Sequence, residues 1–248
     1  MKKTVILIVS AILIAINAGA SLTGVLDLGY KSVYVSSPGG TLYNDSVFQQ
    51  DIILEAPLGL YGIFWSSYSP EKGINSDFGD EIDFILGIYQ ERFKLGFNFS
   101  YIYLNAWDIN STEVDFNLFV LNVDLPKLFW ISPYINLEYD ASFDEDILPG
   151  GFIYRVGCAY EDSLLIQKFN LKYGFNFSMI GHDGVFGLDS QALSSARVKL
   201  NITYNLGNME IIPEITYQKT FKDVQDGGLS EDKLWWGINL AVPFIMIE

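Results

Sequence analysis

The chain has little of the chemistry that enzymes, metal sites and disulfide scaffolds need. Its 248 residues include one cysteine, Cys158, and one histidine, His182. A single cysteine excludes an internal disulfide, and no Cys/His cluster has metal-ligand spacing. Asp183 follows His182, but adjacent side chains seldom face each other, and no Gly-x-Ser-x-Gly nucleophile motif is present. We therefore expect no enzyme activity, no metal and no cofactor, and we interpret His182 as an exposed loop residue.

Basic residues are also scarce. The 15 Lys and Arg stand against 30 Asp and Glu, a formal net charge of −15. Proteins that bind nucleic acid need a basic face for the phosphates, so nucleic acid is excluded as a partner. The acidic run Ser142–Ile147 lacks the spacing and the glycine of an EF-hand loop. We interpret it as a solvated loop rather than a Ca²⁺ site.

Long apolar runs are missing after the first twenty residues. There, Lys2 and Lys3 precede the apolar stretch Val5–Ile16, and Ala18-Gly19-Ala20 offers a small-residue cleavage site, the pattern of a secretory signal peptide. The stretch falls short of the roughly twenty residues that a transmembrane helix needs. We predict a cleaved signal peptide at 1–20 and one mature domain at 21–248. Cleavage removes two lysines and no acid, so the formal charge moves from −15 to −17.

The apolar residues occur instead in about twelve short segments, where they alternate with small polar residues. In FKLGFNFSYIY, from Phe93 to Tyr103, bulky apolar residues occupy every odd position, and Lys94, Asn98 and Ser100 lie between them. A strand has a side-chain period of two, so this segment has one apolar and one polar face. A soluble sandwich also has such strands, but its polar face would carry more charge. We favour an outer-membrane barrel with its apolar face toward lipid.

These segments predict an all-β fold, a single antiparallel transmembrane β-barrel of about 12 strands, with 10 or 14 as alternatives. Short turns such as Pro57-Leu58 alternate with longer polar loops such as Gly181–Leu193, the asymmetry of periplasmic turns and extracellular loops. In the third segment we expect Tyr61, Ile63 and Trp65 to face lipid. The predicted strands are Leu22–Ser36, Ser46–Ala56, Gly59–Tyr68, Gly79–Gln90, Phe93–Leu104, Thr112–Asn122, Trp130–Ala141, Gly151–Glu161, Lys168–Ile180, Ser194–Leu206, Glu210–Phe221 and Lys233–Phe244.

Two features indicate the partners of such a barrel. Tyr and Trp residues near many strand ends, Tyr68, Trp130 and Trp236 among them, are expected to form aromatic girdles at the two faces of the lipid. The last segment, WWGINLAVPF, alternates apolar residues outward and is similar to the C-terminal signal by which barrels are recognised for assembly, although the chain continues to Glu248. We expect outer-membrane lipid and the barrel-assembly machinery as partners.

The lumen-facing charges are predicted to form two arcs. An acidic arc would face a basic arc and set a transverse field that biases the passage of ions and small solutes. The alternative is that these groups pair across strands and fill the lumen with salt bridges. The predicted pore-lining residues are Glu81, Asp83, Glu113, Asp115, Glu138 and Asp140 in the acidic arc, and Arg155, Lys168, Lys172, Arg197 and Lys199 in the basic arc.

Three patches resemble, in order and spacing, the amino-terminal half of the TorF-family porins. They are GYKSVYVSS (29–37), LGLYGIFWSS (58–67) and GDEIDFILGIY (79–89). The family has a tyrosine-rich first strand, a Gly-aromatic-x-Gly-x-Trp strand and a Gly-acidic-x-Asp-x-x-x-Gly-Tyr strand. The residues of this chain at comparable positions are Tyr34, Gly59, Tyr61, Gly62, Trp65, Gly79, Asp83, Gly87 and Tyr89. The Arg-Gly that often follows the family's first strand is replaced by Ser36-Ser37-Pro38-Gly39, so any role of that arginine does not carry over.

The resemblance covers about the first third of the chain and implies an outer-membrane pore without a substrate. The sequence as a whole predicts an exported porin-like channel in the cell outer membrane, through which small hydrophilic solutes or ions diffuse passively. The alternative is a barrel with a closed lumen that acts as a structural or adhesive surface protein through its acidic extracellular loops.

Overall fold

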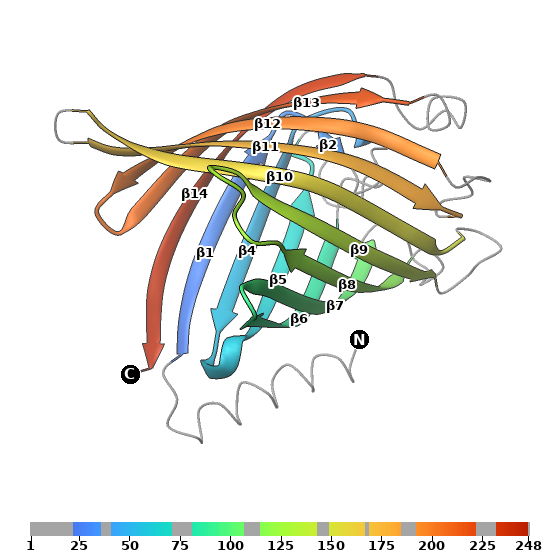
Figure 1. The fold of residues 1–248 in the computed structure, drawn as a ribbon, viewed down its shortest axis with the longest axis horizontal. Coiled ribbons are helices and arrows are strands. Elements are labelled where there is room, and N and C mark those ends of the chain that lie inside the picture. Colours follow the sequence, from blue (N-terminus) through green and yellow to red (C-terminus); the bar gives the residue numbers. More distant parts are fainter. Residues whose placement is uncertain are drawn as a thin grey trace.

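The computed structural model is a closed β-barrel (Figure 1). It describes residues 22–35, 41–70, 81–106, 115–142, 149–166, 169–184, 192–221 and 232–247. Within these ranges no helix has the length and apolar character needed to cross a membrane. The barrel strands are β1 (Leu22–Lys31), β4 (Val47–Glu55), β5 (Leu60–Tyr68), β6 (Glu81–Arg92), β7 (Leu95–Ala106), β8 (Phe116–Asp124), β9 (Ser132–Ser142), β10 (Gly151–Ile166), β11 (Phe169–Asp183), β12 (Ala192–Leu206), β13 (Met209–Thr220) and β14 (Lys233–Ile247).

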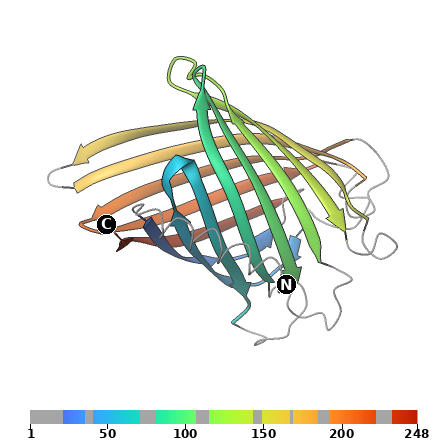
Figure 2. The same cartoon turned by 90° about the horizontal axis from the view of Figure 1, so that it is seen from below.

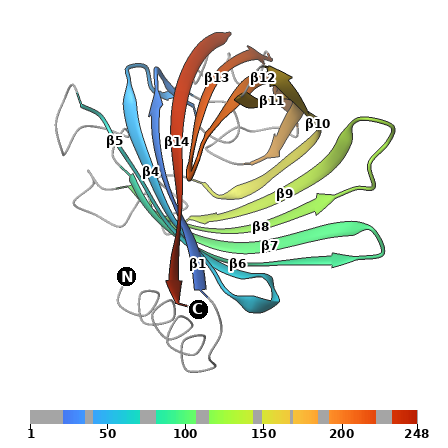
Figure 3. The same ribbon diagram turned by 90° about the vertical axis from the view of Figure 1, so that its left-hand side faces the viewer.

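Each strand pairs with its neighbours in sequence, and the barrel closes where β1 pairs with β14. All pairs are antiparallel, and Leu28 opposite Leu240 marks the closing register. Figures 2 and 3 show the ring from two further directions, with β1 beside β14 in Figure 3. Closure leaves no sheet edge with unpaired N–H and C=O groups, which hydrocarbon would not tolerate. The predicted antiparallel barrel of about twelve strands is confirmed.

The two faces of the wall differ in chemistry. Residues directly opposite each other on neighbouring strands point to the same side. One set of positions contains buried polar residues such as Glu81, Asn136, Thr216 and Gln218, and this set faces the interior. The alternate positions carry large apolar side chains that are exposed, including Phe48, Ile52, Phe99, Phe119, Leu200, Ile202, Ile215 and Ile238. The outer surface is therefore an apolar belt around a polar interior.

Aromatic rings gather on the outer surface near both ends of the wall. At the end with the long loops, the Tyr30 ring lies 5.2 Å from that of Trp236 and 5.3 Å from that of Phe48, which stacks on Tyr68 at 5.5 Å. At the short-turn end, the centroids of Trp130 and Tyr160 are 5.4 Å apart. Each such pair contributes about 0.5–1.5 kcal/mol beyond its buried area. Tyr34 and Trp235, also near strand ends, face inward instead.

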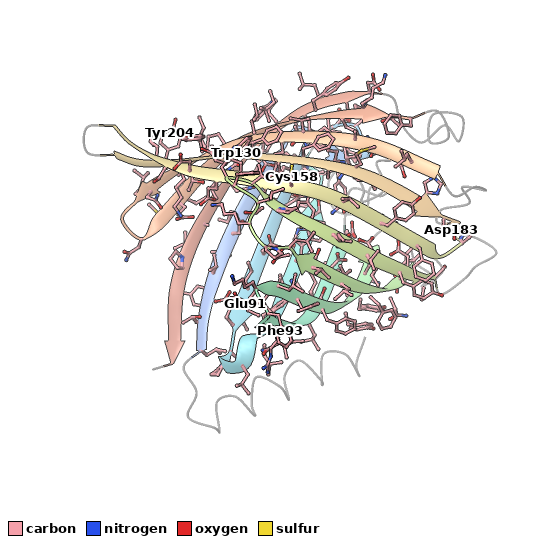
Figure 4. All side chains as sticks on the ribbon, viewed as in Figure 1. Glu91, Phe93, Trp130, Cys158, Asp183 and Tyr204 are labelled. Carbon is pink, nitrogen blue, oxygen red and sulfur yellow. The ribbon has the colours of Figure 1, made fainter. Side chains whose placement is uncertain are left out.

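Most strand ends lie within a few residues of those predicted. The strand β6 continues through Arg92, so the turn to β7 is made by Phe93 and Lys94, both with positive φ (55° and 65°). In Figure 4, Glu91 and Phe93 lie at the end of the barrel opposite Asp183. A short 3-10 turn, η1 (Pro57–Gly59), joins β4 to β5. Strand β10 continues to Ile166, and β11 begins at Phe169. The predicted connector between these two strands, Asp162–Gln167, was therefore too long.

Two predictions about side-chain direction were wrong. Tyr61, Ile63 and Trp65 in β5 pair with Gly87, Ile85 and Asp83, so they face the interior rather than lipid. His182 lies within β11 opposite Ile153, and it is fully buried rather than exposed in a loop. The β5 sequence contains no clear polar face, so only its partners determine which side turns inward.

A small second sheet was not predicted. It consists of β2 (Tyr34–Val35) and β3 (Thr41–Tyr43), which follow β1. Strands this short carry no readable alternation. The hydroxyl of Tyr43 accepts a hydrogen bond of 2.7 Å from the Ser69 hydroxyl just after β5, which ties the hairpin to the rim of the barrel.

Candidate functional site: the inner wall of the barrel

Twelve strands give a barrel of intermediate width. Strands spaced about 4.8 Å apart and tilted by about 40° form a wall with a radius of about 12 Å. Side chains that extend about 6 Å inward from each side leave roughly 12 Å between opposite walls. The residues on the inner wall therefore set the width and the charge of the interior.

An acidic row crosses the strands on one side. Asp27 on β1 is paired with Asp51 on β4. Asp51 is in turn opposite Trp65 on β5, and Trp65 is opposite Asp83 on β6. Two residues along β6, the buried Glu81 faces the same side. Directly opposed carboxylates repel each other in the absence of a cation. This wall is thus a region of concentrated negative charge.

The first hairpin reaches this wall through Tyr34. The Tyr34 hydroxyl donates a hydrogen bond to the Glu81 carboxylate, and the Tyr34 ring lies 6.1 Å from the Trp65 ring at an interplanar angle of 43°. Because Glu81 and Trp65 both face inward, Tyr34 lies over the interior. The hairpin β2–β3 therefore narrows the mouth on the acidic side.

The basic residues Arg197 and Lys199 lie on β12, on the other side of the ring, whereas Lys31 lies on β1 beside the acidic row. Glu214 on β13 forms ion pairs with both Lys31 and Lys199, the second at 3.6 Å. One carboxylate shared by two ammonium groups leaves one net positive charge. The guanidinium Nε of Arg197 donates to Oε1 of Gln218 at 2.7 Å, which is a neutral acceptor.

Asp83 and Arg197 lie on opposite walls. Six strand steps around the ring separate β6 from β12. The row of paired residues that starts at Arg197 runs through Ser178, Gly157, Tyr134, Asp124 and Gly96 to Glu91. Glu91 lies roughly eight residues nearer the short-turn end of β6 than Asp83.

The two charges also lie at a similar height. In a barrel tilted by about 40°, a row of paired residues rises about 3 Å per strand, and each strand rises about 2.5 Å per residue. Along the row from Arg197 to Glu91, the six strand steps descend roughly 20 Å along the barrel axis. From Glu91 back to Asp83, eight residues of β6 climb roughly 20 Å. Arg197 and Asp83 therefore lie at about the same height. The geometry places a negative wall across from a positive one at one level of the lumen.

An aliphatic row adjoins the acidic one. Val25, Ile53, Ile63, Ile85, Ile102 and Leu118 are paired in series across six neighbouring strands. Next to them, Phe116, Leu118 and Val120 form a buried cluster against Ile102 and Leu104. An apolar band therefore crosses six of the twelve barrel strands on the inner wall, which is unusual for a water-filled lumen.

The structure places most of the predicted lining residues on the inner face. Glu81 and Asp83 lie on β6, and the buried Glu138 and Asp140 lie on β9. The basic residues Arg155, Lys172, Arg197 and Lys199 face inward from β10, β11 and β12. Glu113 and Lys168 lie outside the described residues.

Asp115 differs from the prediction. It precedes β8 and accepts hydrogen bonds from the Tyr103 hydroxyl at 2.7 Å and from the Asn105 amide at 3.0 and 3.1 Å. Both partners alternate with the inward residues of β7, because Leu104 is the one paired with Phe116. Asp115 therefore belongs to a buried polar cluster on the outer side of the strand end.

Four charged residues of the two walls, Asp27, Lys31, Asp51 and Glu214, were missed from the sequence. The positions two residues away on the same face are mostly apolar or glycine, as Val25, Gly29, Ile53 and Ile212 are, so no clear polar alternation marked these charges. A weaker signal was present, since Glu214 continues the alternation of Thr216, Gln218 and Thr220.

Comparisons with known proteins support the fold. The NanC porin superposes with a TM-score of 0.55 at 7% identity, covering 88% of this chain and 98% of that one. The KdgM porin in complex with disordered oligogalacturonate gives a TM-score of 0.52 at 7% identity, covering 90% and 99%. The chain has the fold of these porins. No family model and no curated protein matches the sequence.

Proposed function

We propose that the chain is an outer-membrane channel through which small hydrophilic solutes or ions diffuse passively. The observation that carries this proposal is a closed barrel with an apolar outer belt and two walls of opposite charge inside. The apolar belt suits lipid, and the inner walls suit hydrated solutes. The fold shared with two porins and the resemblance to the TorF family support the same conclusion. Export through the signal peptide at 1–20 and assembly through the last strand belong to this proposal.

The charge balance of the interior favours cations. Acidic residues outnumber basic ones on the described part of the inner face: Asp27, Asp51, Glu55, Glu81, Asp83, Glu91, Asp124, Glu138, Asp140, Glu161, Glu210 and Glu214 against Lys31, Arg155, Lys172, Arg197, Lys199 and Lys233. A lumen lined mostly by one sign of charge concentrates the opposite ion. We therefore expect a cation-preferring pore.

Single-channel recording of the refolded barrel in a planar bilayer, with a KCl gradient across it, tests the proposal. Discrete conductance steps and a reversal potential on the cation side are expected. Arg197→Gln removes a positive charge from the basic wall and should move the reversal potential further toward the cation value. A barrel that is inserted in the bilayer but passes no current would contradict the proposal.

One observation favours a closed barrel that acts as a surface protein. Tyr34 lies over the interior, and the apolar cluster around Leu118 occupies part of it. A silent barrel whose conductance appears after Tyr34→Ala would show that the hairpin closes the mouth. Silence in both would favour the structural or adhesive role.

A further inference from the structure

An aromatic and acidic corner stands out on the inner wall. We call it the Trp65 corner, and it consists of Tyr34, Asp51, Trp65, Glu81 and Asp83. The Trp65 indole is flanked in register by Asp51 on one strand and Asp83 on the other. The Tyr34 ring closes one side and is anchored by its hydrogen bond to Glu81. Five residues from four strands thus converge on one region of the wall.

The carboxylates of the corner form no ion pair within the part of the chain that the structure describes. None of the ion pairs there includes Asp51, Glu81 or Asp83. The nearby Lys31 is held by Glu214. One further group independently points to a ligand: the Ser67 hydroxyl, on the residue opposite Glu81, is 3% exposed and has no hydrogen-bond partner among the described residues. Buried hydroxyls are nearly always paired, so this oxygen is available to a bound group.

The neighbouring positions are apolar. Ile53, Ile63 and Ile85 each lie two residues along the strand from Asp51, Trp65 and Asp83 and face the same side. Residues two apart on one face of a strand are separated by about 7 Å. A ligand with a cationic head in the corner would therefore rest its apolar body on this aliphatic floor.

We propose that the Trp65 corner binds organic ammonium ions, and that these are a solute class of the channel. Ring faces of Trp and Tyr attract an ammonium through their quadrupoles, and carboxylates supply the compensating charge. A hydrated metal ion gains little from the rings or from the aliphatic floor, whereas an alkyl or aryl ammonium contacts both. The inference rests on the proposed function only in that the solute reaches the corner through the lumen.

The direct test is calorimetric titration of the refolded barrel in detergent micelles, which needs no ion flow. Benzyltrimethylammonium should bind, and benzenesulfonate, of similar size and opposite charge, should not. Tetramethylammonium, which lacks the apolar body, should bind about tenfold more weakly because it leaves the floor uncovered. Equal affinity for the cation and the sulfonate would overturn the proposal.

Variants locate the site. Trp65→Leu and Asp83→Asn should each weaken benzyltrimethylammonium binding by about tenfold, and Trp65→Phe, which keeps a ring face, by less. The matched controls are Trp236→Leu, on the outer surface, and Asp124→Asn, an inner-wall carboxylate near the short-turn end. Retention of full affinity in folded Trp65→Leu protein, judged by its heat-dependent gel shift, would exclude the corner.

The two proposals fail in different ways. A barrel that conducts KCl but does not bind benzyltrimethylammonium contradicts the ammonium site and leaves the channel standing. A barrel that binds the ion in micelles but never conducts contradicts the channel and leaves the site standing.

Discussion

The assignment of inner and outer faces can be tested on two adjacent residues of β12. Leu200 lies near the middle of the strand, is 50% exposed, and is paired with Phe175 and Ile215 on the outer surface. Its neighbour Asn201 faces inward and is opposite Glu214. Arginine at the lipid midplane of a barrel costs about 2–4 kcal/mol. Leu200→Arg should therefore lower the folding equilibrium constant roughly 30- to 700-fold.

Asn201→Arg should cost far less, because the new guanidinium faces the polar interior and not the hydrocarbon. The assay is a urea titration of both variants folded into phosphatidylcholine vesicles, followed by tryptophan fluorescence and by the gel shift of the folded barrel. If Asn201→Arg destabilised the barrel as much as Leu200→Arg, the outer surface of β12 would not be the lipid surface.

Three further changes have defined outcomes. Asp83→Asn removes a charge from the acidic wall and should reduce the cation preference read from the reversal potential in a KCl gradient. Gly87→Ala would place a Cβ 2.2 Å from the Tyr61 ring, so unfolding by urea should show a loss of about 1–3 kcal/mol; Gly62→Ala, whose nearest neighbour is 3.7 Å away, should be near neutral. Lys94→Gly relieves a positive φ of 65° in the β6–β7 turn and should stabilise the barrel by about 1 kcal/mol in the same assay.

The sequence predicted the barrel because its strands must satisfy two environments at once. Alternation is strong wherever one face meets apolar surroundings and the other does not, as in β11 and β12, and these strands were located to within a few residues. The turn at Phe93 and Lys94 was misplaced because neither residue is a usual turn former at positive φ. The hairpin β2–β3 was missed because two or three residues show no period.

The interior was harder to predict than the fold. Charges that meet across the ring are far apart in sequence, as Asp83 and Arg197 are, and only the register fixes their relative height. The register also fixes which face of β5 is turned inward, since Trp65 faces the interior through its pairing with Asp51 and Asp83. Asp115 shows the converse: it was predicted to face the lumen from within the strand Thr112–Asn122, but it precedes β8 and lies on the outer side.

In the channel proposed above, the tilt of the strands has a consequence for how a cation moves through the lumen. Asp27, Asp51 and Asp83 occupy one row that spans three of the strand-to-strand steps, a quarter of the ring. Over those steps the row climbs about 10 Å. The three carboxylates thus lie on a helical path around the barrel axis. A cation that passes from the first carboxylate to the last moves through about 90° around this axis as it advances. An elongated cation must therefore change its orientation on the way, whereas a compact cation need not.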